Sequence, residues 1–225
     1  WRGEIWNKRK SGDIYPELLS ISAVRDERGQ LQHYIGIFSD ISQIKAHEAE
    51  LNRVANYDPL TGLPNRRLLS DRLQQAIIRA SRSNKACAVC FLDLDGFKAI
   101  NDRFGHPVGD TALVEIGNRL RRVVRRSDFV ARMGGDEFAV LAGDLKGPTP
   151  VVRLARRIRM ALTETLNLPG AKARVGVSIG VAFYPGDADH PDLLLGRADL
   201  ALYAAKREGV GLRLSADLAE VTPVG

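Results

Sequence analysis

The sequence predicts an α+β protein whose main part is an antiparallel sheet with helices covering one face. A near-continuous apolar run at residues 86–92 is typical of a central strand that is buried on both faces. Two runs of alternating apolar residues flank Gly134 and Gly135, and this pattern predicts a tight hairpin. Segments with helical periodicity separate the strands in the order α-β-α-β-β-α-β-α. That order contains the split βαββαβ arrangement of ferredoxin-like folds.

Residues 1–57 predict a smaller sheet followed by a helix. Three antiparallel strands are expected at residues 4–8, 15–24 and 33–38, and a sheet of this size is marginal alone. Residues 41–57 are expected to be helical, with one stripe of regularly spaced residues: Ile44, His47, Leu51 and Val54. This helix either packs on its own domain or forms a parallel dimer stalk.

In the main part, four segments carry an apolar stripe at helical spacing and predict helices. They are residues 68–81, 111–124, 151–166 and 192–206. A further strand is expected at residues 174–183. With the central strand and the hairpin, these segments account for a complete domain.

The composition is that of an ordinary globular protein. The chain has 225 residues, of which 44% are hydrophobic and 27% charged, enough for one full domain and a smaller part. It begins at Trp1, so it is expected to be a piece of a longer protein. No apolar run approaches the ~18 residues that predict a membrane span. The net charge of +6 is compatible with an anionic partner.

Cys87 and Cys90 form a C-x-x-C string, a pattern typical of redox or zinc sites. Both lie in the expected central strand, where positions three apart face opposite sides of the sheet. Buried, reduced thiols are therefore the expected state, which agrees with a reducing compartment.

The predicted hairpin carries two adjacent carboxylates, Asp136 and Glu137, where its second strand begins. Strand alternation would point them to opposite faces. A structural hairpin needs no acid pair, whereas a site for a hard cation does. An ordinary charged turn is the alternative.

Residues 134–138 read Gly-Gly-Asp-Glu-Phe and spell the motif for which the GGDEF family, the diguanylate cyclases, is named. Residues 58–67, 93–110 and 198–206 resemble further motifs of that family, in the same order. The resemblance covers about residues 56–212. It implies the palm-like fold of nucleotide cyclases and some polymerases.

The resemblance also implies a domain organisation. Residues 1–40 resemble the C-terminal part of a PAS sensor domain, and residues 41–57 would be a coiled-coil signalling helix. The GGDEF domain would occupy residues 58–212, followed by a tail or linker at 213–225. The signal that the PAS part senses is not encoded in these residues.

Asp93 and Asp95 end the central strand two residues apart and therefore face the same side. Capping of the next helix is an alternative role for Asp95. The resemblance implies metal binding by Asp93, the backbone carbonyl of Leu94 and Asp136, with Mg²⁺ as the cofactor and Mn²⁺ as a substitute. It assigns Glu137 to deprotonation of a ribose 3′-hydroxyl or to metal contact, so that Asp93, Asp136 and Glu137 form the catalytic set.

The resemblance further implies a set of GTP-binding residues: Leu63, Phe97, Lys98, Asn101, Asp110, Leu113 and Lys206. The lysines would contact phosphates, Asn101 and Asp110 would read guanine, and the leucines would wall the base. An acid that accepts from the two adjacent donors of guanine rejects adenine. Each residue also has a simpler role: Lys98 as a solvated lysine, Asp110 as the N-cap of a helix from Thr111, and the leucines as core.

Arg125 and Asp128 match the R-x-x-D product-inhibition site of the family, in which arginine forks grip phosphate and guanine. A surface ion pair is the alternative. The chain departs from the family at Val210 and Gly211, where the pattern usually has Arg-Asn after Lys-x-x-Gly. Loss of a phosphate cation would weaken triphosphate binding by about 1 kcal/mol. Replacing Val210 by Arg is therefore expected to lower the KM for GTP.

Together these features predict a diguanylate cyclase that condenses two GTP into cyclic di-GMP and two pyrophosphates, with cyclic di-GMP as its inhibitor. One domain binds one GTP, so catalysis requires a two-fold homodimer. The expected location is the cytoplasm, alone or within a membrane-anchored parent protein. The alternative function is a silent GTP-binding domain that regulates a fused phosphodiesterase. A nucleic-acid binder would leave the acidic motifs unexplained.

Overall fold

The computed structural model describes residues 1–219 of the chain. The chain divides into two compact units, at residues 1–55 and 56–225. No helix within the described residues is both long enough and apolar enough to cross a membrane.

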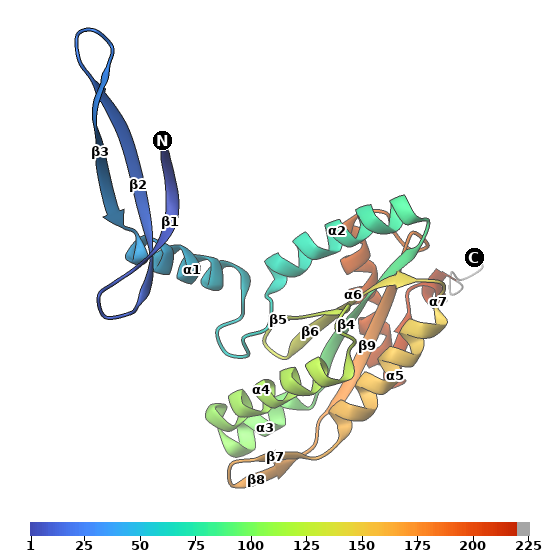
Figure 1. Cartoon of the computed structure of the whole chain (residues 1–225). Helices are drawn as coiled ribbons and strands as arrows, with labels where there is room; N and C mark the ends of the chain where they lie inside the picture. Colours follow the sequence, from blue (N-terminus) through green and yellow to red (C-terminus); the bar gives the residue numbers. More distant parts are fainter. Residues whose placement is uncertain (220–225) are drawn as a thin grey trace. The chain divides into compact units, whose positions relative to one another are not determined.

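The first unit is a three-stranded antiparallel sheet followed by a helix (Figure 1). Its strands are β1 (Arg2–Lys8), β2 (Ile14–Arg25) and β3 (Leu31–Asp40), and its helix is α1 (Ser42–Asn56). The three predicted strands and the predicted helix are confirmed. Asp40 accepts a hydrogen bond from the backbone N–H of Ser42 at 2.9 Å, which caps the start of α1.

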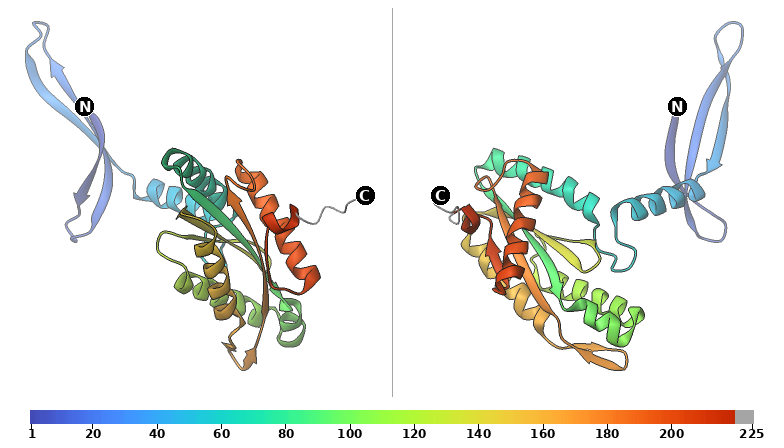
Figure 2. Two further views of the ribbon diagram at one scale, coloured as in Figure 1. Left: turned by 90° about the vertical axis from the view of Figure 1, so that its right-hand side faces the viewer. Right: turned by 180° about the vertical axis from the view of Figure 1, so that it is seen from behind.

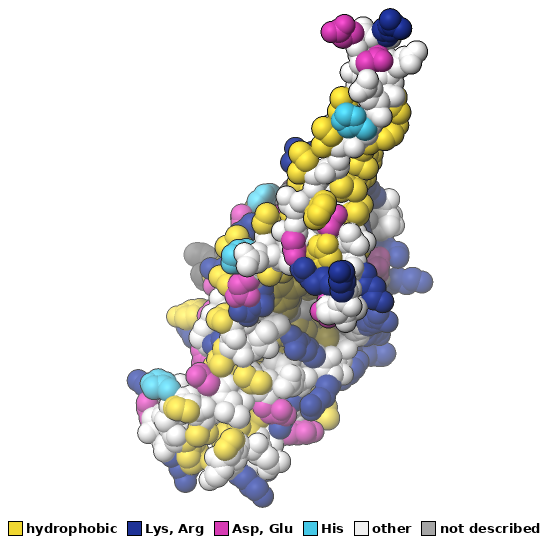
Figure 3. All heavy atoms as spheres, turned by 60° about the vertical axis from the view of Figure 1, so that its left-hand side comes forward, with side chains coloured by type: hydrophobic (Ala, Val, Ile, Leu, Met, Phe, Trp, Pro, Cys, Tyr) yellow, Lys and Arg dark blue, Asp and Glu magenta, His cyan; other side chains and the backbone are white. Residues whose placement is uncertain are grey.

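Apolar side chains are exposed on both elements of this unit. Figure 3 shows them along the sheet, where the exposed set on β3 is Tyr34, Ile35, Ile37 and Phe38. Within the described part of the chain, α1 buries none of its residues. Ile44, Leu51 and Val54 are 57%, 71% and 64% exposed. The apolar stripe of α1 is therefore exposed.

The second unit is built on a five-stranded sheet in the order β10-β9-β4-β6-β5. The strands are β4 (Ala86–Asp95), β5 (Phe129–Gly134), β6 (Glu137–Leu145), β9 (Gly176–Tyr184) and β10 (Leu212–Leu214). β4 lies at the centre, as its apolar run predicted. All neighbours pair antiparallel except β10, which runs parallel to β9. The main helices are α2 (Arg66–Ser83), α4 (His106–Val123), α5 (Thr149–Thr163) and α6 (Pro191–Glu208).

Helices cover both faces of this sheet, so the expectation of helices on one face was wrong (Figures 1 and 2). Cys87, Val89 and Phe91 of β4 pack in a cluster with α2 and α6. The intervening residues of β4, with Cys90 and Leu92 among them, pack in a second cluster with α4 and α5. An apolar run without alternation requires cover on both sides, because each successive side chain points to the other face.

The two cysteines behave as core residues. Cys87 and Cys90 are free, buried and on opposite faces of β4. Burial raises the pKa of the Cys87 thiol to about 11 and that of Cys90 to about 12. Neither thiol forms the reactive thiolate to a useful extent near neutral pH, which rules out the C-x-x-C redox role.

The elements that the sequence did not predict are short. They are α3 (Phe97–Phe104), the hairpin β7 (Leu166–Leu168) and β8 (Ala171–Ala173), the edge strand β10, and α7 (Ala216–Ala219). Residues 213 and 214, assigned to a tail, instead lie in β10, because Leu212 and Leu214 pack against the core. Residues 220–225 of that tail lie outside the described part.

Gly180 allows α6 to lie directly on β9. A Cβ at this position would lie 2.1 Å from the carbonyl oxygen of Ala198 and 2.2 Å from the backbone nitrogen of Leu202. Both atoms belong to the helix backbone, so no side-chain rotation can relieve the clash. The close contact fixes the height of α6 above the sheet, and with it the position of Lys206 in its last turn.

Gly180→Ala is expected to lower the free energy of unfolding by about 3 kcal/mol, since a rigid core must shift to admit the methyl group. Gly196→Ala is the matched control in α6, where a Cβ would meet nothing within 4 Å. It is expected to raise stability by about 1 kcal/mol through helix propensity. Chemical denaturation of the three proteins checks both signs, and equal stability of the two variants would refute the close-contact argument.

Candidate active site on the Gly-Gly hairpin

The register of the sheet brings the acidic residues of two motifs together. Asp93 near the end of β4 is the direct partner of Glu137 at the start of β6. Cross-strand partners lie on the same face of a sheet, here the face covered by α2 and α6. Asp136 precedes β6 in the turn, where Gly134 and Gly135 have φ values of +144° and +52°. The two glycines thus supply the turn that the sequence predicted.

The three carboxylates lie within electrostatic reach of one another. Burial, followed by the negative charge of Asp93, raises the pKa of Asp136. Burial, followed by the charges of Asp93 and Asp199, also raises the pKa of Glu137, with Arg66 opposing it. Asp136 and Glu137 therefore both lie near Asp93, although strand alternation had separated them. Asp136 lies in the turn before β6, so the alternation of a regular strand does not govern its direction.

A lysine already neutralises part of this negative charge. The Nζ atom of Lys206 lies 2.6 Å from Oδ1 of Asp93. Within residues 1–219, no three acidic, His or Cys side chains are close enough to hold a metal ion by themselves. Neighbouring carboxylates that attract a cation suit a hard divalent ion, which would here take the rest of its ligands from phosphate oxygens and water.

Asp95 has a different partner. Its carboxylate accepts a hydrogen bond from the Ser178 hydroxyl of β9, at 3.0 Å to Oδ1 and 3.1 Å to Oδ2. Helix α3 begins after Gly96, and no side chain of the described residues caps it. The capping alternative for Asp95 is therefore wrong, and the carboxylate serves to join β4 to β9.

The two residues expected to read guanine come from a tight helical corner. Gly105 separates α3 from α4, so Asn101 of α3 folds back on the first turns of α4. Its Oδ1 lies 1.8 Å from where a Cβ of Gly109 would be, so Asn101 packs against the residue that precedes Asp110 in α4. Asp110 lies inside α4 rather than before it, because α4 begins at His106. Its alternative role as an N-cap is wrong.

The remaining expected GTP contacts divide between surface and core. Lys98 is exposed on the first turn of α3. Phe97, Leu63 and Leu113 are buried in the cluster under α4. The side chain of Leu63 packs against Gly117 of α4, with Cδ1 at 3.1 Å from where a Cβ would be. The core role of the leucines is thus observed, and only an edge of either is available to a base.

Arg125 and Asp128 line a cavity of about 310 Å³, together with Arg153 and Arg157 of α5. The two residues form no ion pair in the described structure. Asp128 instead accepts a hydrogen bond from the backbone N–H of Arg125 at 3.0 Å, which shapes the turn between them. The sequence did not single out Arg153 and Arg157, because α5 is far from this motif along the chain.

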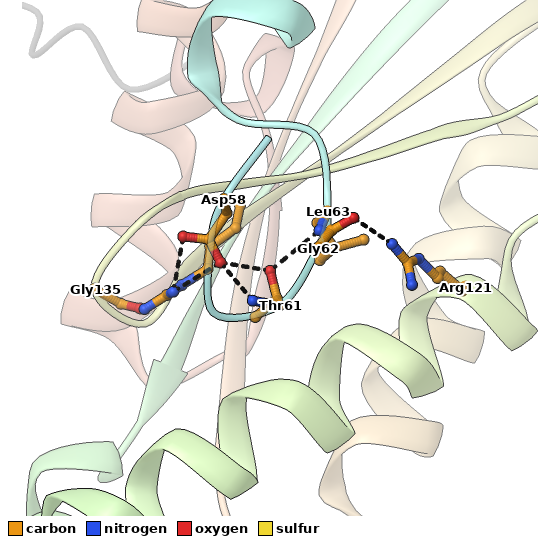
Figure 4. Close-up of polar contacts among 7 residues, drawn as sticks. Asp58, Thr61, Gly62, Leu63, Arg121 and Gly135 are labelled. Atoms are coloured by element: carbon orange, nitrogen blue, oxygen red, sulfur yellow. Dashed lines mark hydrogen bonds and ion pairs between the residues drawn. The ribbon is translucent and has the colours of Figure 1, made fainter. Parts of the chain in front are cut away.

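Arg132 of β5 joins the hairpin turn to the loop before α2 through contacts with Gly135 and Asp58, both of which are labelled in Figure 4. Its guanidinium donates to both carboxylate oxygens of Asp58, at 2.9 and 3.0 Å, and to the carbonyl of Gly135, at 2.7 and 3.0 Å. Burial alone would raise the pKa of Asp58, but hydrogen bonds from Thr61 and the charge of Arg132 outweigh it, and the pKa is lowered. The ionised carboxylate of Asp58 thus holds Arg132 in place, and Arg132 in turn binds the turn that carries Asp136.

A five-stranded sheet with helices on both faces, whose edge hairpin β5–β6 carries acids beside the central strand β4, defines a protein with the fold of the nucleotide cyclases. Residues 55–211 match the family described as "Diguanylate cyclase, GGDEF domain". The chain belongs to this family.

Characterised relatives agree with this assignment. Diguanylate cyclase TpbB of Pseudomonas aeruginosa is 43% identical over 178 residues, which cover 79% of this chain and 41% of TpbB. MucR of the same species, a bifunctional diguanylate cyclase and cyclic di-GMP phosphodiesterase, is 44% identical over 160 residues, covering 71% of this chain and 23% of MucR. The chain thus spans less than half the length of these relatives.

Solved structures show the same fold. The GGDEF domain of TpbB superimposes with a TM-score of 0.69 at 45% identity, covering 71% of this chain and 94% of that one. The coiled coil and GGDEF domain of DgcB from Caulobacter crescentus, solved in complex with cyclic di-GMP, gives a TM-score of 0.69 at 29% identity, covering 77% of this chain and 93% of that one.

Proposed function

We propose that this chain acts as a diguanylate cyclase, which joins two GTP molecules into cyclic di-GMP and releases two pyrophosphates. The observation that carries the proposal is the convergence of Asp93, Asp136 and Glu137 on one edge of the hairpin, beside Lys206. A domain that only bound GTP would not need three partly buried acids there.

Each group of residues in the site has a distinct task in this proposal. Asn101 and Asp110 bind the guanine edge, while Lys98 and Lys206 hold the phosphates. Asp93, Asp136, Glu137 and the carbonyl of Leu94 would hold Mg²⁺ or Mn²⁺, which supplies Lewis-acid polarisation of phosphate oxygens when bound. Glu137 is also the candidate that assists deprotonation of the ribose 3′-hydroxyl.

Each domain offers one such site, so two chains must face each other for the reaction. The exposed apolar stripe of α1, formed by Ile44, Leu51 and Val54, suits a parallel dimer stalk. In this proposal residues 1–40 are the C-terminal part of a PAS sensor. The helix α1 transmits changes in the geometry of that sensor to the cyclase domain. A cytoplasmic location follows from the use of GTP.

The direct test is product formation from GTP and Mg²⁺, measured over a range of protein concentrations. Specific activity should rise with concentration and then saturate, because only the dimer is productive. The alternative, a silent GTP-binding domain that regulates a fused phosphodiesterase, predicts GTP binding without product at every concentration. None of the site residues described above favours that alternative.

We also propose that the cavity of Arg125, Asp128, Arg153 and Arg157 binds cyclic di-GMP as a feedback inhibitor. Three arginines around 310 Å³ offer planar donors to phosphate and guanine. Arg125→Ala is expected to raise the inhibitory concentration of cyclic di-GMP by about 10-fold or more, the loss of one charged contact.

Initial rates with added cyclic di-GMP provide the measurement. Arg126→Ala is the matched control, because Arg126 neighbours Arg125 but does not line this cavity. Uninhibited rates should be similar in all three proteins. If Arg125→Ala remains as sensitive as the unaltered chain, the inhibitory site lies elsewhere.

A further inference from the structure

A second cavity is lined in part by Lys206. It has a volume of about 370 Å³, and its charged lining consists of Arg159, Lys206 and Asp95. The rest of the wall includes Ser178 and three glycines, Gly176, Gly209 and Gly211. Residues from β4, β9, α5 and α6 therefore meet here. No single sequence motif contains all the residues that line the cavity.

Gly211 makes room for the Arg159 side chain. A Cβ at position 211 would lie 2.7 Å from Cζ and 2.8 Å from Nε of Arg159. The backbone of Gly211 also has a φ of +71°, which other residues rarely adopt. The absence of a side chain at this position thus allows the guanidinium from α5 to lie against the loop that follows α6.

The two cations differ in their partners. Lys206 already pairs with Asp93. The guanidinium of Arg159 forms neither an ion pair nor a hydrogen bond with any described residue, and the bond that the Thr163 hydroxyl donates to Arg159 goes to its backbone carbonyl. An exposed arginine held beside a cavity without a protein partner retains all its donors for a ligand. The lining carries two positive side chains, Arg159 and Lys206, and one negative side chain, Asp95, so its net positive charge favours an anionic ligand.

We propose that Arg159 binds the terminal phosphates of the nucleoside triphosphate that Lys206 contacts. This inference rests on the proposed function, since it assigns a further part of the same substrate site. Arg159 would supply a planar donor pair from α5, and Lys206 a point charge from α6. The chain would thereby recover a phosphate cation that Val210 and Gly211 do not supply.

Binding, measured by calorimetry, tests this independently of turnover. The ligands are inorganic pyrophosphate, GMP and a non-hydrolysable GTP analogue, each with Mg²⁺. Arg159→Ala is expected to weaken binding of pyrophosphate and of the analogue by about 10-fold, the loss of one charged contact, and to leave GMP unchanged. Arg156→Ala, an exposed arginine of the same helix that does not line this cavity, should bind all ligands as the unaltered chain does.

A rescue variant strengthens the test. Val210→Arg should improve analogue binding more in the Arg159→Ala background than in the unaltered chain, because Arg159 already supplies a phosphate cation in the unaltered chain. Unchanged pyrophosphate and analogue binding in Arg159→Ala would overturn the inference. Absence of cyclic di-GMP formation by the unaltered chain, with Arg159-dependent binding intact, would instead refute the proposed function and leave the anion site standing.

Discussion

Asp136→Ala is expected to reduce the rate of cyclic di-GMP formation by at least about 100-fold, more than is typical for residues that only support a metal ligand. The carboxylate lies beside Asp93 and Glu137, and burial together with Asp93 raises its pKa. Its removal takes away one of the three acids that would hold the divalent cation. Chromatographic separation of nucleotides after incubation with GTP and Mg²⁺ provides the measurement.

Two comparisons make the result specific. Asp71→Ala removes an exposed acid from α2 and should leave the rate within about 2-fold of the unaltered chain, as expected for an isolated surface substitution. Guanine recognition is assigned to Asn101 and Asp110, so Asp136→Ala should still bind a GTP analogue. Substantial product from the Asp136→Ala variant would mean that the chemistry does not occur at the hairpin.

Arg132→Ala is expected to have the second largest effect, on both stability and turnover. The side chains of Arg132 and Asp58 are only 10% and 17% exposed. Removal of the guanidinium leaves a nearly buried carboxylate without its countercharge, which should cost about 3 kcal/mol of unfolding free energy. It also releases the carbonyl of Gly135, so the turn that carries Asp136 loses its anchor. We expect kcat to fall by about 10- to 100-fold from misplacement of this group.

Arg121→Ala is the matched control for this network. Arg121 donates to the carbonyl of Gly62 in the same loop but does not contact the hairpin turn (Figure 4). It should affect stability modestly and leave kcat nearly unchanged. Kinetics well below the unfolding temperature separate the two effects, and Arg132→Lys should recover charge but not kcat, since one ammonium cannot span both partners. An unaltered kcat in Arg132→Ala would limit its role to stability.

Local sequence patterns predicted most of the elements, and tertiary contacts decided how they are covered. The apolar stripes and the Gly-Gly turn each depend on a few neighbouring residues, so periodicity sufficed for four helices and the hairpin. The run at residues 86–92 predicted a strand that is buried on both faces, and this prediction is confirmed. The expectation of helices on one face only was inconsistent with it and was wrong. Short elements such as α3 and β10 were missed, because their few residues carry no period and are stabilised by the core they join.

The sequence by itself determined which acids are present, where the turn lies and which family motifs surround it. Only the tertiary structure decided that Asp93 faces Glu137 across two strands, that Arg132 ties Asp58 to the turn, and that Arg159 lies against Gly211. The physical reason is separation along the chain. Periodicity and turn chemistry act over a few residues, whereas these contacts join segments that only sheet register and helix packing bring together.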